Sequence, residues 1–300
     1  MGTDTAIEWT DHTFNPWEGC QKVGPGCDNC YAEARNARFG GGTAPNWGPG
    51  APRRLTSKAN WRAPLKWAKR AAEFQAEHGR RQRVFCASLA DVFDNAVDPA
   101  WRADLFELIR QTPELDWLLL TKRVGNVSSM LPEDWGHGWD HVWLGITVVN
   151  QDEADRDIPK LEATPAAVRF LSVEPMLGAI QFPSLERVDW VICGGESGDG
   201  ARPMHPEWAR QVRDQCAAAD VPFLFKQWGD WLPVIVQGET FMRADGARSD
   251  DLYELRDGLD ECPDDHPFWT TWGFARVGKK KAGRFLEYDT HNGFPDSPAA

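Results

Sequence analysis

Long apolar runs are missing from this sequence. No segment approaches the roughly 20 apolar residues that a membrane-spanning helix needs. The first residues, MGTDTAIEWTDHTF, also lack the basic and apolar regions of a signal peptide. The sequence therefore predicts a soluble, cytoplasmic protein with no membrane partner.

Basic residues are also fewer than acidic residues. Lys and Arg together number 33 against 45 Asp and Glu, which gives a formal net charge of −12. This balance excludes a protein that coats nucleic acid nonspecifically, because that mode of binding needs many Lys and Arg contacts to phosphate. One compact basic cluster, Lys279 to Lys281 with Arg284, follows an acidic stretch at 250–265. It predicts either a solvated surface strand or turn, or a phosphate-binding edge.

A disulfide framework is not indicated, because seven cysteines is an odd number in a chain of cytosolic character. Three of the seven, Cys20, Cys27 and Cys30, fall within eleven residues. Cys86 and Cys193 lie inside strand-like apolar runs, where a thiol usually behaves as a small buried hydrophobic group. The three clustered cysteines are therefore the candidates for chemistry.

Short β-rich runs alternate with helical patterns along most of the chain. We predict strands at 7–14, 83–89, 116–122, 141–148, 168–174, 189–195 and 221–228. The clearest helical patterns cover 31–39, 99–111 and 206–219. About seven strand–helix units imply a parallel sheet with covering helices, either a (β/α) barrel or an open doubly wound sheet.

Polar residues at or just after the C-terminal ends of the predicted strands favour the barrel. They are Asp91, Lys122, Arg123, Glu174, Glu196 and Lys226. In a barrel all of them point to the one mouth where barrel enzymes carry their chemistry. We therefore predict an α/β fold, a partial or complete TIM-like barrel over residues 1–232. It has an inserted loop and helix at about 40–80, the helix itself covering 63–78. Residues 233–300 are predicted to form a C-terminal extension packed on the barrel.

The segment NPWEGCQKVGPGCDNCYAEA has the cysteine spacing CxxxxxxCxxC. Two cysteines separated by two residues bind one metal centre from a single turn, and the Gly-rich stretch before them lets the third fold back. Three thiolates without a fourth favour a [4Fe-4S] cluster with one open iron, because structural zinc sites normally close with four ligands. Zinc with His12 as its fourth ligand, and a loop without metal, stay open as alternatives.

Five segments carry motifs specific enough to compare with known families: WTDHTFNPWEGCQKVGPGCDNCYAEA, FLSVEPMLGAI, WVICGGESGDGARPMHPEW, PFLFKQWG and VGKKKAGRFL. Together they resemble the phage-associated three-Cys-motif family, a domain of unknown function widespread in phages and bacteria. More distantly, three cysteines before a helix on a βα barrel resemble the radical SAM superfamily, whose usual spacing is CxxxCxxC. That resemblance implies S-adenosylmethionine bound at the open iron, reductive cleavage of its sulfonium, and an electron donor for the cluster.

Two carboxylates follow adjacent predicted strands and therefore converge in a barrel. We predict catalytic roles for Glu174, Glu196 and Lys226. The two carboxylates either grip the amine of S-adenosylmethionine or act as an acid/base pair. The alternative is that Glu174 and Glu196 form salt bridges to Lys226 and Arg202 as scaffolding of the barrel mouth.

Two groups of residues are predicted to bind the cofactor. Asp91, Lys122 and Arg123 follow neighbouring strands and can fix a carboxylate, a ribose hydroxyl or a phosphate. The second group is the tight loop of Gly194, Gly195, Glu196 and Ser197. This loop resembles the Gly-Gly-Glu-Pro segment of the radical SAM superfamily, although it follows about the sixth strand here rather than the second.

The leading hypothesis is a radical-SAM-like iron-sulfur enzyme that acts on a nucleotide, nucleic acid or related substrate. The second is a phage or bacterial metal-binding accessory protein, holding iron-sulfur or zinc. The resemblance implies that such a protein works with a three-Cys-motif partner protein. A zinc-dependent hydrolase ranks last, because the seven histidines are dispersed and none forms a short-spaced pair near the cysteines.

Overall fold

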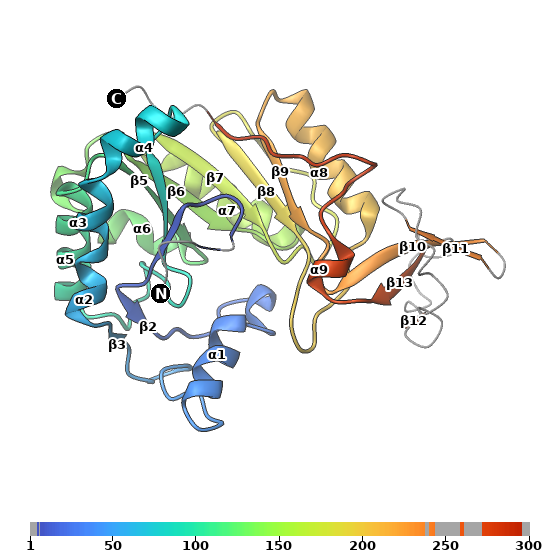
Figure 1. Cartoon of the computed structure of the whole chain (residues 1–300), viewed down its shortest axis with the longest axis horizontal. Coiled ribbons are helices and arrows are strands. Elements are labelled where there is room, and N and C mark those ends of the chain that lie inside the picture. Colours follow the sequence, from blue (N-terminus) through green and yellow to red (C-terminus); the bar gives the residue numbers. More distant parts are fainter. Residues whose placement is uncertain (1–4, 6, 238–239, 244–258, 261–271, 296–300) are drawn as a thin grey trace.

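The computed structural model describes residues 5, 7–237, 240–243, 259–260 and 272–295. Seven parallel strands form one sheet in the order β1-β4-β5-β6-β7-β8-β9, and this sheet curls into a half-barrel (Figure 1). The strands are β1 (His12–Phe14), β4 (Gln82–Cys86), β5 (Leu115–Thr121), β6 (Val142–Thr147), β7 (Val168–Val173), β8 (Trp190–Gly194) and β9 (Phe223–Gln227). Their spatial order follows the chain, whereas a doubly wound sheet reverses its order at a switch point. The predicted partial TIM-like barrel is therefore confirmed.

Both faces of the sheet are buried, as expected of parallel strands made almost entirely of apolar residues. On β5, Trp117 and Leu119 pack into the cluster that includes the covering helices. Leu118 between them packs into a second cluster on the concave side. The alternation follows from the two-residue period of a strand, so each strand supplies side chains to both cores.

Helices cover the convex face of the sheet (Figure 1). They are α5 (Pro99–Arg110), α6 (Val124–Met130), α7 (Gln151–Ala163) and α8 (Pro206–Ala218). Side chains cap three of them: Asp98 accepts a hydrogen bond from the Ala100 N–H, Asn150 accepts one from the Glu153 N–H, and His205 accepts one from the Glu207 N–H. The predictions for 99–111 and 206–219 are correct to within one residue. Among the described helices none is long and apolar enough to cross a membrane.

The N-terminal part of the chain contributes short elements before β4. Its elements are β2 (Trp17–Glu18), η1 (Pro25–Cys27), α1 (Tyr31–Phe39), β3 (Arg54–Leu55), α2 (Lys58–Trp61), α3 (Ala63–Ala68) and α4 (Ala71–His78). The single helix predicted over 63–78 is wrong, because α3 and α4 are separate. The carbonyl of Trp67 accepts hydrogen bonds from the Arg70 N–H and the Gln82 side chain, which ends α3 there.

The C-terminal part begins with an antiparallel sheet in the order β11-β10-β13-β12. Its strands are β10 (Trp231–Gln237), β11 (Thr240–Arg243), β12 (Leu259–Asp260) and β13 (Trp272–Arg276). The basic residues 279–281 belong to a one-turn helix, α9 (Lys279–Ala282), whereas most of the acidic stretch at 250–265 lies outside the described residues. The chain then returns to β9, where the Phe225 N–H donates to the His291 carbonyl. This segment covers the edge strand and protects its backbone groups.

Aromatic side chains fill the concave side of the half-barrel. Trp190 contacts Trp9, Trp143 and Phe170 with ring centroids 5.7 to 6.2 Å apart, and Phe294 of the returning segment lies 5.1 Å away. These rings fill the interior of the half-barrel and bury a large apolar area. The space that they leave open therefore lies at the carboxyl ends of the strands.

We expect Gly145→Ala to destabilise the fold. Gly145 lies on β6 against the ring of Phe170, and an added Cβ would lie 2.3 Å from its Cζ atom. Overpacking of this kind lowers the free energy of unfolding by roughly 1–3 kcal/mol, measurable by urea denaturation. Gly125→Ala is the control: it is exposed on α6 with no atom within 4 Å of an added Cβ, so stability should rise by up to about 1 kcal/mol. Equal stability of the two variants would contradict the packing of Phe170.

Candidate functional site

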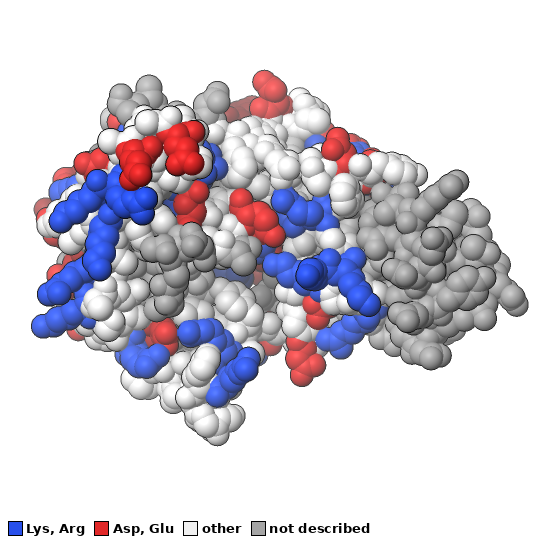
Figure 2. Space-filling view, viewed as in Figure 1, with Lys and Arg blue, Asp and Glu red and all other residues white. Residues whose placement is uncertain are grey.

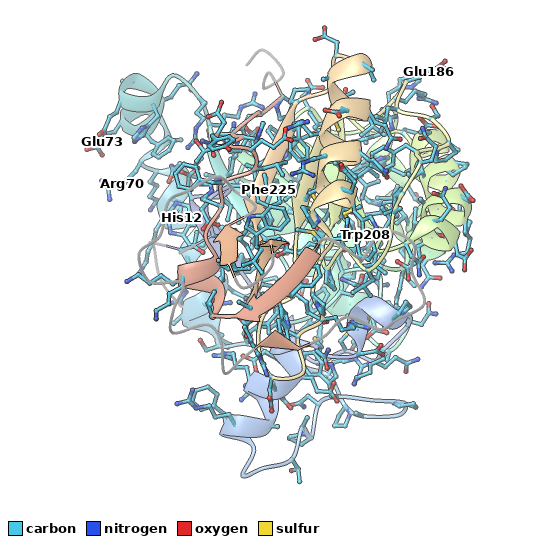
Figure 3. All side chains as sticks on the ribbon, turned by 90° about the vertical axis from the view of Figure 1, so that its right-hand side faces the viewer. His12, Arg70, Glu73, Glu186, Trp208 and Phe225 are labelled. Carbon is cyan, nitrogen blue, oxygen red and sulfur yellow. The ribbon has the colours of Figure 1, made fainter. Side chains whose placement is uncertain are left out.

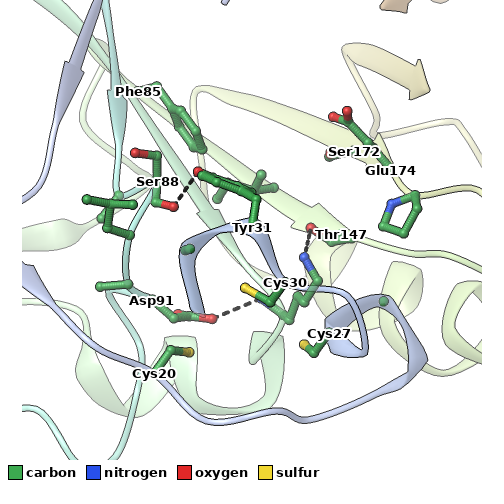
Figure 4. A pocket seen from close by; sticks show the side chains of 18 of the residues that line it. Cys20, Cys27, Cys30, Tyr31, Phe85, Ser88, Asp91, Thr147, Ser172 and Glu174 are labelled. Atoms are coloured by element: carbon green, nitrogen blue, oxygen red, sulfur yellow. Dashed lines mark hydrogen bonds between the residues drawn. The ribbon is translucent and has the colours of Figure 1, made fainter. Parts of the chain in front are cut away.

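A cavity of about 760 Å³ lies at the carboxyl ends of the strands (Figure 4). Every predicted site residue except Gly194 lines it: Cys20, Cys27, Cys30, Asp91, Lys122, Arg123, Glu174, Gly195, Glu196, Ser197 and Lys226. These residues come from the cysteine loop, from the segments that follow β4, β5, β7 and β8, and from β9 itself. The half-barrel thus brings together positions more than 200 residues apart in the chain.

The three clustered cysteines are half-buried free thiols that face one side of the cavity (Figure 4). Cys27 ends the short helix η1, and Cys30 is the residue just before α1. Within the described part of the chain, no group of three His, Cys, Asp or Glu side chains is arranged to hold a metal ion. His12, the predicted alternative zinc ligand, lines a separate cavity, where it stacks on Trp67.

A first carboxylate–arginine pair holds the start of the cysteine loop. Asp91 accepts hydrogen bonds from the Thr121 hydroxyl at 2.8 Å and from Arg123 Nη1 at 3.0 Å. Arg123 Nη2 in turn donates to the Gln21 carbonyl at 2.9 Å, and its Nη1 lies 3.4 Å from Cys20 Sγ. Burial raises the pKa of the Cys20 thiol to about 11, although Arg123 acts to lower it.

A second pair holds the rest of the loop. The Glu196 carboxylate accepts hydrogen bonds from the Arg202 backbone and guanidinium at 2.8 to 2.9 Å, and from Asn29 Nδ2 at 3.2 Å. Arg202 also donates to the Pro25 carbonyl and to the Asp28 carboxylate. Burial by itself would raise the pKa of Glu196, but these hydrogen bonds outweigh it and hold the pKa below its ordinary value.

Glu174 and Lys226 form a third ion pair on the cavity wall. Lys226 Nζ lies 2.7 and 2.9 Å from the two Glu174 oxygens, and Gln227 Nε2 lies 3.3 Å from one of them. Gly194 lies beside this pair, and an added Cβ would make ordinary contacts of 3.4 Å with both Glu174 and Lys226. The salt bridges of the scaffolding alternative, Glu174 to Lys226 and Glu196 to Arg202, are both present.

Gly195 has a packing role in addition to its place on the cavity wall. A Cβ at Gly195 would lie 2.0 Å from the carbonyl oxygen of Trp228, and one at Gly229 would lie 2.0 Å from that of Glu196. The segments after β8 and β9 therefore pass each other backbone to backbone, which only glycine allows. The close approach of the two main chains is enough to explain why position 195 is glycine, and no bound ligand is needed for that explanation.

Sequence reasoning missed two residues of the cavity wall. Tyr31 follows Cys30 directly, and its hydroxyl donates to the Ser88 carbonyl. The signal in the sequence that could have found Tyr31 is its position directly after a clustered cysteine. Lys279 of α9 reaches the cavity from the C-terminal part of the chain, and no local pattern places it there.

Comparisons with known proteins identify the family. The model of a family described as "Protein of unknown function (DUF5131)" matches residues 4–295, so the chain belongs to this family. A search of the curated proteins finds no match.

Two solved structures are similar to the chain, each with a TM-score of 0.41 over 91% of this chain and 70% of the other. One is a spore photoproduct lyase complexed with dinucleoside spore photoproduct, at 12% identity. The other is a double mutant of spore photoproduct lyase with bound AdoMet and the same dinucleoside, at 13% identity.

We expect Arg202→Ala to loosen the cysteine loop. The change removes charged hydrogen bonds that are each worth about 1.5–3 kcal/mol, so amide hydrogen exchange over residues 20–30 should accelerate at least about tenfold. Arg213→Ala is the matched control, because Arg213 pairs with Asp214 and Glu287 instead of with the loop. Unchanged exchange in Arg202→Ala would show that the loop is held by other contacts.

Proposed function

We propose that this DUF5131 protein is a radical-SAM-like enzyme whose Cys20, Cys27 and Cys30 hold a [4Fe-4S] cluster. The observation that carries the proposal is the meeting of these three thiols on one cavity wall. Among the described residues no other cysteine lines that cavity. Three soft thiolate donors suit an iron-sulfur cluster and would leave one of its irons without a cysteine ligand.

The donor set suits the cluster in chemistry, and the three thiols line the same cavity. When bound, the cluster supplies the electron that cleaves the sulfonium of S-adenosylmethionine, and an external electron donor must reduce it. The cavity volume of about 760 Å³ lies within the roughly 300–1,000 Å³ of small-molecule sites and leaves room beyond the thiols. S-adenosylmethionine and the reacting part of a substrate can share that room.

The remaining site residues divide by what they contact. Asp91, Arg123 and Glu196 act as positioning residues, because their hydrogen bonds hold the cysteine loop. Glu174 and Lys226 are the candidate catalytic pair, since they line the cavity and contact each other rather than the loop. A substrate hydroxyl or amine can exchange a proton with this pair.

Lys122, Gly195 and Ser197 are the proposed contacts to S-adenosylmethionine. Lys122 Nζ donates to the Thr147 hydroxyl at 3.2 Å, and among the described residues no carboxylate forms an ion pair with it. Its ammonium is therefore available to an anionic group of a ligand. Gly195 and Ser197 offer backbone and hydroxyl groups on the neighbouring wall.

An accessory role with a protein partner is the second candidate. Phe39 at the end of α1 is 74% exposed, although α1 follows the cysteine loop directly. Aromatic side chains are enriched at protein contact surfaces, and Phe39 offers one at the end of α1 that is distant from Cys30. A three-Cys-motif partner that binds the protein, with no cleavage of S-adenosylmethionine by either, would favour this role.

The decisive experiment measures iron content and reductive cleavage of S-adenosylmethionine in the anaerobically reconstituted protein. We expect about four irons per chain and formation of 5′-deoxyadenosine with dithionite as reductant. Cys27→Ala should lose cluster iron and cleavage together. Cys216→Ala is the matched control and should keep both, because Cys216 is buried on α8 away from the cavity. Stoichiometric zinc without iron, or an intact cluster without cleavage, would refute the radical mechanism.

A further inference from the structure

The cations that line the cavity differ in their partners. Most of them face a carboxylate within 4 Å: Lys22, Arg35, Arg123 and Lys226. Lys122 and Lys279 form no ion pair with a carboxylate of the described residues. Within the part of the chain that the structure describes, positive charge without a carboxylate partner therefore occurs at two places: at Lys122 beside Thr147 inside the cavity, and at Lys279 of α9 at the rim of the cavity.

The positive charge at the rim of the cavity lies on an exposed turn that is anchored to the rest of the chain. Lys279 and Lys280 open α9, and the side chains of both are exposed. The turn is anchored by the buried Ala282 and by Asp230, whose carbonyl accepts from the Gly278 N–H at 3.0 Å. Figure 2 shows Lys and Arg atoms gathered over α9 on the face viewed there. In the side view of Figure 3 the same helix lies at the surface.

An aromatic ring faces the cavity from the cysteine side. Tyr31 is 58% exposed, yet its hydroxyl is fixed by the hydrogen bond to the Ser88 carbonyl. Figure 4 shows the ring between Cys30 and Phe85. A ring that is held at its tip and open on its face is a preformed stacking platform for a base.

We propose that the substrate is a single-stranded nucleic acid. Its phosphodiester chain lies along Lys279 and Lys280, and one base enters the cavity and stacks on Tyr31. This inference names the substrate of the proposed function and rests on it for the chemistry, whereas strand binding requires only α9 and Tyr31. The net charge of −12 disfavours nonspecific binding of the strand.

Fluorescence anisotropy of a labelled oligonucleotide of about 12 bases tests the proposal on the reconstituted holoprotein. The double variant Lys279→Glu, Lys280→Glu should raise the Kd at least about tenfold and flatten its salt dependence. The matched control is Lys58→Glu with Lys66→Glu, two exposed lysines of α2 and α3 outside the cavity, which should leave the Kd within about twofold.

The ring is tested separately from the charge. Tyr31→Leu should raise the Kd about fivefold or more. Tyr31→Phe keeps the stacking face of the ring and should raise the Kd by a smaller factor. Oligomers of DNA and RNA are compared, and the tighter binder identifies the sugar of the substrate. Equal competition by polyglutamate of the same charge, or an unchanged Kd in the Lys279, Lys280 variant, would overturn the proposal.

Iron content and S-adenosylmethionine cleavage are measured on the same samples. Loss of strand binding in the Lys279, Lys280 variant with full iron content supports the inference. Absence of cleavage in the wild-type protein, with strand binding that still depends on these lysines, refutes the proposed function and leaves the inference standing. The two failures are thereby distinguished.

Discussion

Two carboxylate–arginine pairs hold the cysteine loop over the mouth of the half-barrel, and the geometry of the site depends on them. Asp91 with Arg123 fixes the start of the loop, and Glu196 with Arg202 fixes its second half. A glycine-rich loop loses much conformational entropy when it becomes ordered. Arg123 and Arg202, held by the buried carboxylates, donate charge-assisted hydrogen bonds to the loop carbonyls that offset that loss and place the thiols on the cavity wall.

The half-barrel gives those pairs a rigid base. Its concave side is packed with aromatic rings around Trp190, and the returning segment at 291–294 covers the edge strand β9. The open space is thereby limited to the carboxyl ends of the strands, where Tyr31 of α1 and Lys279 of α9 both line it. Segments from the two ends of the chain thus form one site (Figure 1).

The fold and much of the site were predictable because their signals are local. Apolar runs and helical patterns gave the six strands of the parallel sheet between residues 82 and 228 to within three residues, whereas the antiparallel strands β10 to β13 were not predicted. Polar residues after strand ends gave the cavity wall, including Glu174 and Lys226, because parallel strands end on one side of a sheet. The break between α3 and α4 was missed, since it depends on Gln82, a residue of the neighbouring strand.

The sequence by itself determined the parallel α/β architecture and the three grouped thiols, because periodicity and short spacing are properties of neighbouring residues. Only the tertiary structure decided what each charged residue contacts. Asn29 and Glu196 are 167 positions apart, so no sequence pattern shows that they meet. The same holds for Lys279, which reaches the cavity because the chain folds back along β9. Ion-pair partners depend on distance in space, which the curvature of the half-barrel sets.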